Sequence, residues 1–405
     1  MIDLTRRDFV NSSAKFFGAL SLMGLIPGEV AARSPESKTL VAVFLRGGND
    51  GVNTIIPYGD DEYYNLRPRI SIRESDVIKL SGSDILGLHP RLEPLKEIYD
   101  AGHLAIFPAA HNDYLNRSHF ESQDMLESGL SSITSDGWLN RFLKNNTGDN
   151  SLLRAVSLTS NLAKVFQGPY SVSNFADLGN FKSSIPENML LGWSSLYAAF
   201  NGGSTPLSTL ISGSADSLFK DLNKINEINS VDYVVENGAE YPMYNSTANK
   251  FRDAARLIKN SDIEVIGLDI GGYDTHTNQR NRQDGLHGNL AGSMKAFYKD
   301  LGPERMKNVT MLVYTEFGRT AKENASAGTD HGNATSYMVM GGNINGGLYG
   351  AWPGLTASQM ENGRYLKHSV DCGDIISELL VKFLGAGDIN NIFPNHSYTP
   401  LNFIA

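Results

Sequence analysis

Residues Thr39–Leu45 have the sequence TLVAVFL, and Arg46–Gly51, with the sequence RGGNDG, follow directly. An uninterrupted apolar run of this length is typical of a strand buried on both faces, as in a parallel sheet covered by helices. The glycine-rich turn ends the strand, and the carboxyl end of such a strand is where α/β proteins place their ligands. This stretch therefore predicts an α/β fold with functional side chains in the loop after the strand.

Four further apolar runs follow the same pattern and also meet polar or glycine-rich loops: Leu104–Phe107, Ile263–Ile270, Val309–Tyr314 and Tyr337–Met340. Segments with helical periodicity lie between and after them: Pro90–Ala101, Phe120–Leu126, Ala248–Lys259, Leu290–Leu301 and Asp374–Leu384. Strands that alternate with helices predict a three-layer αβα domain with a mostly parallel sheet, which we place at residues 38–402.

Residues 151–244 interrupt this alternation. They are rich in Ser, Asn and Gly and contain scattered helical pieces such as Ser214–Ile225. Because no linker-like stretch flanks them, we predict an inserted cap or lid built onto the sheet rather than an independent domain.

The composition limits the class of protein and the chemistry of any metal site. The chain has 405 residues, 41% of them hydrophobic, which is globular and excludes disordered, collagen-like and coiled-coil proteins. The net charge of -9 argues against a nucleic acid or an anionic membrane surface as partner. Cys372 is the one cysteine, so a metal must be held by Asp, Glu, His or hydroxyl groups.

The amino terminus resembles a twin-arginine export signal. Arg6 and Arg7 precede the apolar stretch Ala14–Ile26, and small residues suited to cleavage end at Ala32. A membrane-anchoring helix is the alternative, but the stretch is shorter than the roughly 20 residues needed to span a bilayer. We expect residues 1–32 to direct folded export by the twin-arginine translocase, leaving a periplasmic or extracellular protein with no stable membrane span.

Side chains able to hold a divalent metal ion lie in the loops after four predicted strands and before the fifth: Asp50, His119, Asp274, His276, Glu316, Asp330 and His331. Each motif alone is weak, since an Asp after two glycines is usually a turn residue. Asp274 and His276 stand two residues apart in a loop, so both can reach one ion. Convergence of these loops at one sheet edge predicts a metal site, with ligand atoms within roughly 5 Å of one point.

Ser118 and two arginines are candidates for contact with an anionic substrate. Ser118 and Glu121 have the spacing of a capping box at the start of the helix Phe120–Leu126, which alone could explain the serine. A hydroxyl at a helix amino terminus is also placed to meet an anionic ester. Arg117 and Arg319 could add anion contacts, although most surface arginines are simply solvated.

Six motifs in chain order carry a family resemblance: Phe44–Gly51, Arg117–Phe120, Gly271–His276, Thr315–Thr320, Gly328–Gly332 and Gly346–Gly350. Together with the twin-arginine start, they make the chain similar to the exported bacterial family DUF1501, which is placed in the alkaline phosphatase and sulfatase superfamily. That resemblance implies an alkaline-phosphatase-like fold.

The superfamily implies two metal ions, often zinc or manganese, near a Ser, Thr or modified Cys nucleophile that attacks phosphorus or sulfur. Magnesium or calcium are alternatives. By motif, Asp50 matches the ligand after the first strand and Ser118 the nucleophile. Asp274 and His276 match a paired Asp and His, although their spacing is shorter than is usual in the superfamily.

Two mappings of the later motifs remain open. Asp330 and His331 resemble an Asp-His-Gly motif of phosphoglycerate mutases in this superfamily. By strand order, which we prefer, Glu316 replaces the Asp, Phe317 replaces its His, and His331 supplies the last histidine. The second mapping leaves one histidine fewer and implies either one metal ion or an inactive site.

The resemblance and the loop residues give two hypotheses. The first is a metal-dependent hydrolase of phosphate or sulfate esters, acting on a small anionic ester or an extracytoplasmic polymer. The second is an inactive exported binding or assembly protein that keeps the fold, with or without one metal. Phe317 at a possible ligand position favours the second.

Overall fold

The computed structural model describes residues 36–129, 131–146, 152–179, 221–394 and 396–405. The chain divides into two compact units: Arg33–Asp149, Leu153–Leu178 and Tyr233–Ala405 form the larger, and Met1–Ala32, Asn150–Leu152 and Gly179–Asp232 the smaller. In the smaller unit, residues 221–230 are helical. The predicted signal, and residues 180–220 of the predicted insertion, lie outside the described residues.

A mostly parallel sheet forms the centre of the larger unit, as predicted, with strand order β11-β5-β10-β9-β1-β8-β6-β7 and β12 paired with β5. Its strands are β1 (Thr39–Leu45), β5 (Leu104–His111), β6 (Ala155–Leu158), β7 (Ser173–Asn174), β8 (Val265–Ile270), β9 (Val309–Tyr314), β10 (Thr335–Gly341), β11 (Gly347–Leu348) and β12 (Val370–Asp371). All five predicted strands are present, and β1 lies at the centre, where Val41 is in register with Ile266 of β8 and Met311 of β9.

The direction of β10 decides where the loops meet. β10 is antiparallel to both of its neighbours, β5 and β9, whereas the other pairings in this sheet are parallel. The start of β10 therefore lies at the same edge as the carboxyl ends of β1, β5, β8 and β9. The loop before β10 and the loops after these strands open onto one edge.

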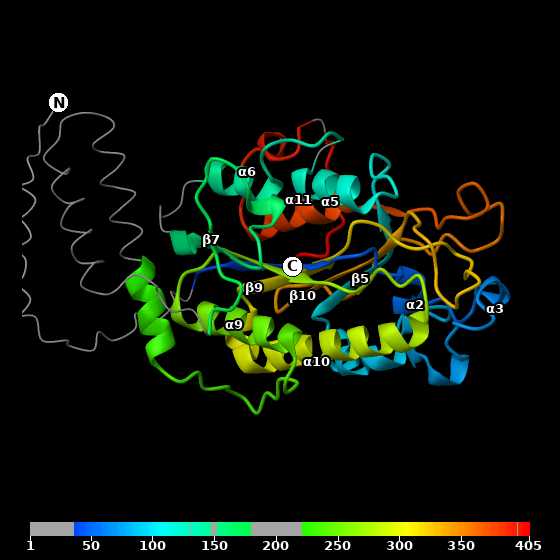
Figure 1. The fold of residues 1–405 in the computed structure, drawn as a ribbon, viewed down its shortest axis with the longest axis horizontal. Helices are drawn as coiled ribbons and strands as arrows, with labels where there is room; N and C mark the ends of the chain where they lie inside the picture. Colours follow the sequence, from blue (N-terminus) through cyan, green and yellow to red (C-terminus); the bar gives the residue numbers. More distant parts are fainter. Residues whose placement is uncertain (1–35, 130, 147–151, 180–220, 395) are drawn as a thin grey trace, which may run out of the picture. The chain divides into compact units, whose positions relative to one another are not determined.

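Helices cover both faces of the sheet (Figure 1). One face carries α5 (His119–Ser128), α6 (Trp138–Asn145) and α11 (Cys372–Glu378), and the other carries α9 (Ser246–Asn260) and α10 (Gln279–Met306). On the first face, Phe44 and Tyr314 of the sheet share a buried cluster with Trp138 of α6 and Ile376 of α11. Apolar residues on both faces of each central strand produce this layering.

Two predicted helices differ from the observed elements. The segment predicted as Pro90–Ala101 is a 3-10 helix, Pro90–Leu95, followed by α4 (Lys96–Asp100), and Pro94 inside it lacks the N–H that a regular helix needs. The last predicted helix is α11 followed by a π-helical turn, Leu379–Phe383.

Two described parts of the predicted insertion, Leu153–Leu178 and the residues from Tyr233 onward, belong to the larger unit. β6 and β7 extend the central sheet beyond β8. Further along, the hydroxyl groups of Tyr233 and Tyr241 donate to the buried carboxylate of Asp300 in α10, at 2.5 and 3.0 Å. The residues of β6, β7, Tyr233 and Tyr241 are thus part of the larger unit rather than of a separate cap.

The remaining α-helices and strands lie between β1 and β5 in the sequence. They are α2 (Gly51–Thr54), α3 (Asp61–Leu66) and a small sheet of order β2-β4-β3, formed by β2 (Ile55–Ile56), β3 (Ile78–Lys79) and β4 (Gly87–Leu88). Within the part of the chain that the structure describes, no helix is long and apolar enough to cross a membrane.

Candidate metal centre

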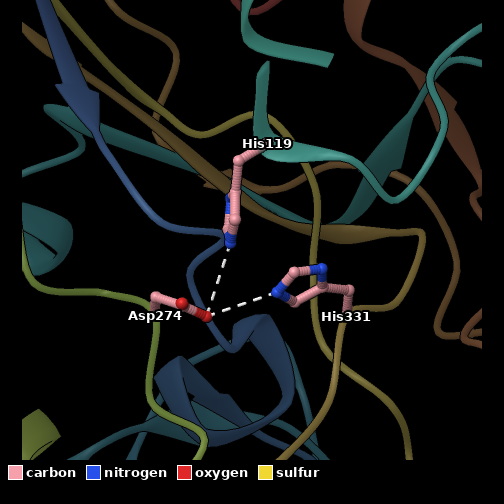
Figure 2. Close-up of side chains that lie close together, drawn as sticks. All are labelled: His119, Asp274 and His331. Atoms are coloured by element: carbon pink, nitrogen blue, oxygen red, sulfur yellow. Dashed lines mark ion pairs between the residues drawn. The ribbon is translucent and has the colours of Figure 1, made fainter. Parts of the chain in front are cut away.

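Five predicted site residues meet at the edge of the sheet where these loops open. His119 begins α5 after β5, Asp274 and His276 lie in the loop after β8, Arg319 follows β9, and His331 precedes β10. Figure 2 shows His119, Asp274 and His331, whose side chains point toward one another from the start of α5 and from two loops. One ligand atom from each of these three lies within 4.8 Å of the others.

A single carboxylate oxygen is the meeting point. Oδ1 of Asp274 lies 3.4 Å from Nε2 of His119, 3.4 Å from Nε2 of His331 and 3.0 Å from Nε2 of His276. The two nitrogens Nε2 of His276 and His331 are 3.0 Å apart. Three imidazole Nε2 atoms and one carboxylate oxygen therefore face the same small volume.

The other nitrogen of each imidazole faces an oxygen acceptor. Nδ1 of His119 lies 2.8 Å from Oε1 of Glu316, and Nδ1 of His331 lies 2.8 Å from the carbonyl oxygen of Arg117. Nδ1 of His276 lies 3.4 Å from Oδ1 of Asp330. Because these partners only accept, each Nδ1 carries a proton, and Nε2 is the nitrogen whose lone pair can bind a metal ion. Outer acceptors of this kind fix the tautomer of metal-binding histidines.

This arrangement fits a divalent cation. Two lone pairs 3.0 Å apart on His276 and His331 repel each other unless a cation or a proton lies between them. Nε2 of His119 and Oδ1 of Asp274 are buried and have no hydrogen-bond partner. Ligand bonds of about 2.0–2.1 Å in a tetrahedral site separate neighbouring ligand atoms by about 3.3 Å, close to the spacings seen here. Imidazole nitrogens with one carboxylate suit zinc and other borderline metals.

Arg319 places a buried cation beside this cluster. The residue is 1% exposed, and its Nη1 lies 2.9 Å from Oδ1 of Asp274. Nη1 is thus engaged in this ion pair, whereas the buried Nη2 has no hydrogen-bond partner. A buried guanidinium with unused donors is suited to an oxyanion, which it can bind with two N–H groups.

The surroundings set the charge of the cluster. Burial is the largest single effect and raises the pKa of Asp274, but Arg319 together with His276 and His119 outweighs it and holds that pKa below its usual value. The bond to Glu316 raises the pKa of His119, whereas burial lowers the pKa of His331. At neutral pH, Asp274 is ionised and His331 is neutral, which are the forms that bind metal.

Glu316 and Asp330, both predicted as ligands, lie behind the histidines. Oε1 of the buried Glu316 accepts from Nδ1 of His119, from Nε2 of Gln123 at 2.8 Å and from the N–H of Gly47 at 3.0 Å. Asp330 faces Nδ1 of His276. Both carboxylates thus orient imidazoles rather than joining the four converging atoms.

Asp50 is held elsewhere, contrary to its predicted role as a ligand. Its two oxygens accept from Nη1 and Nη2 of Arg67 at 2.6 and 3.0 Å, and Nε2 of Gln279 also donates to it. Asp50 and Arg67 are both fully buried. The guanidinium of Arg67 also donates to Asn53 and to the carbonyl oxygens of residues 320 and 321. Its positive charge already neutralises the Asp50 carboxylate.

Ser118 does not form the predicted capping box, and the guanidinium of Arg117 is paired outside the cluster. Ser118 precedes α5, but its side chain makes no capping bond, and Glu121 accepts from Asn116 instead. The predicted capping box therefore does not form. The guanidinium of Arg117 bonds Asn333 at 3.0 Å, so this residue reaches the cluster through its carbonyl oxygen.

Phe317 packs against the cluster as an aromatic wall. Its ring centroid lies 4.8 Å from that of His119 and 5.0 Å from that of His331. A Cβ atom at Gly48 would lie 2.5 Å from this ring, which explains the glycine. At the position where the resemblance implies a histidine, Phe317 supports two ligand rings and supplies no ligand.

Sequence reasoning missed Gln123 and Arg67. Gln123 stands four residues after His119, the spacing that places two side chains on one helix face, so this signal was available. Arg67 carries no such signal, because its contacts with Asp50 and with residues 320 and 321 arise only in the folded chain.

The family comparison covers part of this centre. Residues 237–382 match the model of a family described as a protein of unknown function, DUF1501. The matched segment contains Asp274, His276, Arg319 and His331 and supports the family resemblance, while His119 lies before it. A search of curated proteins finds no match to the chain.

Proposed function

We propose that the protein is a metal-dependent hydrolase of phosphate or sulfate esters. One observation carries the proposal: three imidazole Nε2 atoms and a carboxylate oxygen converge beside a buried arginine with unused donors. The cluster suits a divalent cation, and the arginine suits a substrate oxyanion. A site that holds both is typical of enzymes that hydrolyse anionic esters.

Each residue of the candidate centre has a proposed role. His119, Asp274, His276 and His331 would hold one ion, with zinc or manganese suiting the donor set. A bound divalent ion supplies Lewis-acid stabilisation of charge on the ester and lowers the pKa of a bound water or hydroxyl. Arg319 donates its free N–H groups to the nonbridging oxygens and steadies the anion.

Ser118 is the proposed nucleophile, with a water molecule as the alternative. Its hydroxyl makes no capping bond, and it stands next to His119 at the amino end of α5. The helix dipole there favours an anion and a developing negative charge. These features are compatible with attack on phosphorus or sulfur.

The wider assignment follows the resemblance. We place the chain in the alkaline phosphatase and sulfatase superfamily, exported through a twin-arginine signal at residues 1–32 to the periplasm or beyond. The three-layer arrangement of the larger unit is compatible with that fold.

A second candidate is an exported binding or assembly protein that keeps one metal ion but has no turnover. Two observations favour it: Phe317 supplies no ligand, and Asp50 is neutralised by Arg67, so the described loops offer one ion site. One ion gives less charge stabilisation than two, which lowers the expected rate.

Elemental analysis combined with ester hydrolysis separates the candidates. The mature chain, from residue 33, is purified, stripped with chelator and reloaded with zinc or manganese. We expect one ion per chain, and hydrolysis of an aryl phosphate or aryl sulfate that chelator abolishes. One ion per chain without turnover across both substrates and metals would favour the binding protein, and a chain that binds neither metal would contradict the site itself.

A further inference from the structure

The residues that support His119 lie on one face of α5. His119, Gln123 and Glu127 are spaced by four residues and therefore lie in line along this helix. His119 reaches the cluster, Glu127 is buried, and Gln123 lies between them. The line connects the candidate metal centre to a partly buried ion-pair network.

Arg46 is the centre of that network. Its Nη atoms donate to both oxygens of Glu127 at 2.9 Å, and its Nε donates to Asp269 at 3.0 Å. Nη1 also donates to Oε1 of Gln123 at 3.2 Å. Two carboxylates hold this guanidinium, so it presents a fixed donor to Gln123.

The amide of Gln123 has one orientation that satisfies its neighbours. Its oxygen faces Arg46, so its nitrogen faces Glu316 and donates to Oε1 at 2.8 Å. The same Oε1 accepts from Nδ1 of His119 at 2.8 Å. The carboxylate of Glu316 is fully buried. It depends on these donors, because a charge removed from water must be compensated by hydrogen bonds.

We propose that Gln123 is a positioning residue of the metal centre: it fixes the Glu316 carboxylate between Arg46 and His119, and so aims Nε2 of His119 at the ion. This inference rests on the proposed metal-dependent function. Loss of a partner behind a ligand typically lowers metal affinity about 10- to 100-fold. Gln123 itself touches neither the four converging atoms nor any reacting group.

Two substitutions separate positioning from general stability. Gln123→Met keeps the length of the side chain and removes both hydrogen bonds. Gln123→Glu keeps the contact with Arg46 but sets a carboxylate against Glu316. Gln167→Met is the matched control, because Gln167 is exposed and its amide nitrogen bonds a backbone carbonyl oxygen.

Two readouts test the proposal. In the metal-free protein, at a pH where the His119 ring is neutral, nitrogen NMR reports which ring nitrogen carries the proton, and we expect Nδ1–H in the wild type and in Gln167→Met. In both Gln123 variants we expect a mixture of tautomers. With cobalt(II) as the probe, we expect about 10- to 100-fold weaker binding and an altered visible spectrum in the Gln123 variants.

A folded Gln123→Met or Gln123→Glu protein with the wild-type tautomer and wild-type cobalt affinity would overturn the proposal. If Gln123→Met does not fold, Gln123→Glu carries the test. If the wild type binds no cobalt, the proposed function fails, while the NMR comparison still decides whether Gln123 orients His119.

Discussion

Replacing His331 by alanine tests the candidate metal centre most directly. The change removes the Nε2 atom that lies 3.4 Å from Oδ1 of Asp274 and 3.0 Å from Nε2 of His276. A four-ligand zinc site contributes about 10–16 kcal/mol of binding free energy, so one ligand accounts for about 2.5–4 kcal/mol. We therefore expect His331→Ala to weaken zinc binding by a factor of about 100 to 1,000.

The expected loss of stability in the metal-free protein is much smaller. His331 donates one hydrogen bond, to the carbonyl oxygen of Arg117, and a single bond of this kind contributes about 1 kcal/mol. The two effects can be separated by measuring zinc affinity in a chelator competition and unfolding by denaturant in the stripped protein.

Two other histidines serve as controls. His103 bonds the hydroxyl group of Tyr298 just before the start of β5, at the opposite edge of the sheet from the cluster. His396 bonds Asp374 near the carboxyl terminus. Alanine at either position should leave zinc affinity within a factor of about two, since neither touches the cluster. A folded His331→Ala protein that keeps wild-type zinc content and affinity would refute the assignment.

Three further outcomes follow from buried charges. Arg319→Met should keep one metal ion per chain but lower kcat/KM about 100-fold or more, because the oxyanion loses its donor, and equal rates would exclude an anion contact. Arg67→Met leaves the Asp50 carboxylate buried without its partner and should lower the free energy of unfolding by about 3–5 kcal/mol, part of which Asp50→Asn restores in the double variant. Burial raises the pKa of Asp253 to about 6, so its folded form binds a proton more readily than the unfolded chain. Stability relative to Asp253→Asn should therefore fall by about 2 kcal/mol as the pH rises from 4 to 6, and parallel denaturation curves would contradict this.

The sheet could be predicted from the sequence because its central strands are buried on both faces. β1 and β9 have the predicted bounds, Thr39–Leu45 and Val309–Tyr314, since both are unbroken apolar runs. Strand direction could not be predicted, because an apolar run has the same pattern whether its neighbours are parallel or antiparallel. The reversal of β10, which brings His331 to the functional edge, becomes visible only in the pairing with β5 and β9.

The candidate site was predictable where the chemistry is local. Asp274 and His276 are two residues apart in one loop, and the structure brings both to the cluster. The role of Asp50 was not predictable, because the same carboxylate can meet a metal ion or a guanidinium. Arg67, its partner, is a neighbour only after folding.

The orientation of the three histidines depends on loops that are distant in sequence. The loop after β9 supplies Glu316 to His119, the loop before β10 supplies Asp330 to His276, and the loop after β5 supplies the carbonyl oxygen of Arg117 to His331. No imidazole is oriented by its own loop, so the centre assembles only when all the loops are folded together. The segment that matches the family, residues 237–382, contains three of the converging side chains but neither His119 nor Arg117. The chain before that segment is therefore as necessary to the proposed metal centre as the matched part.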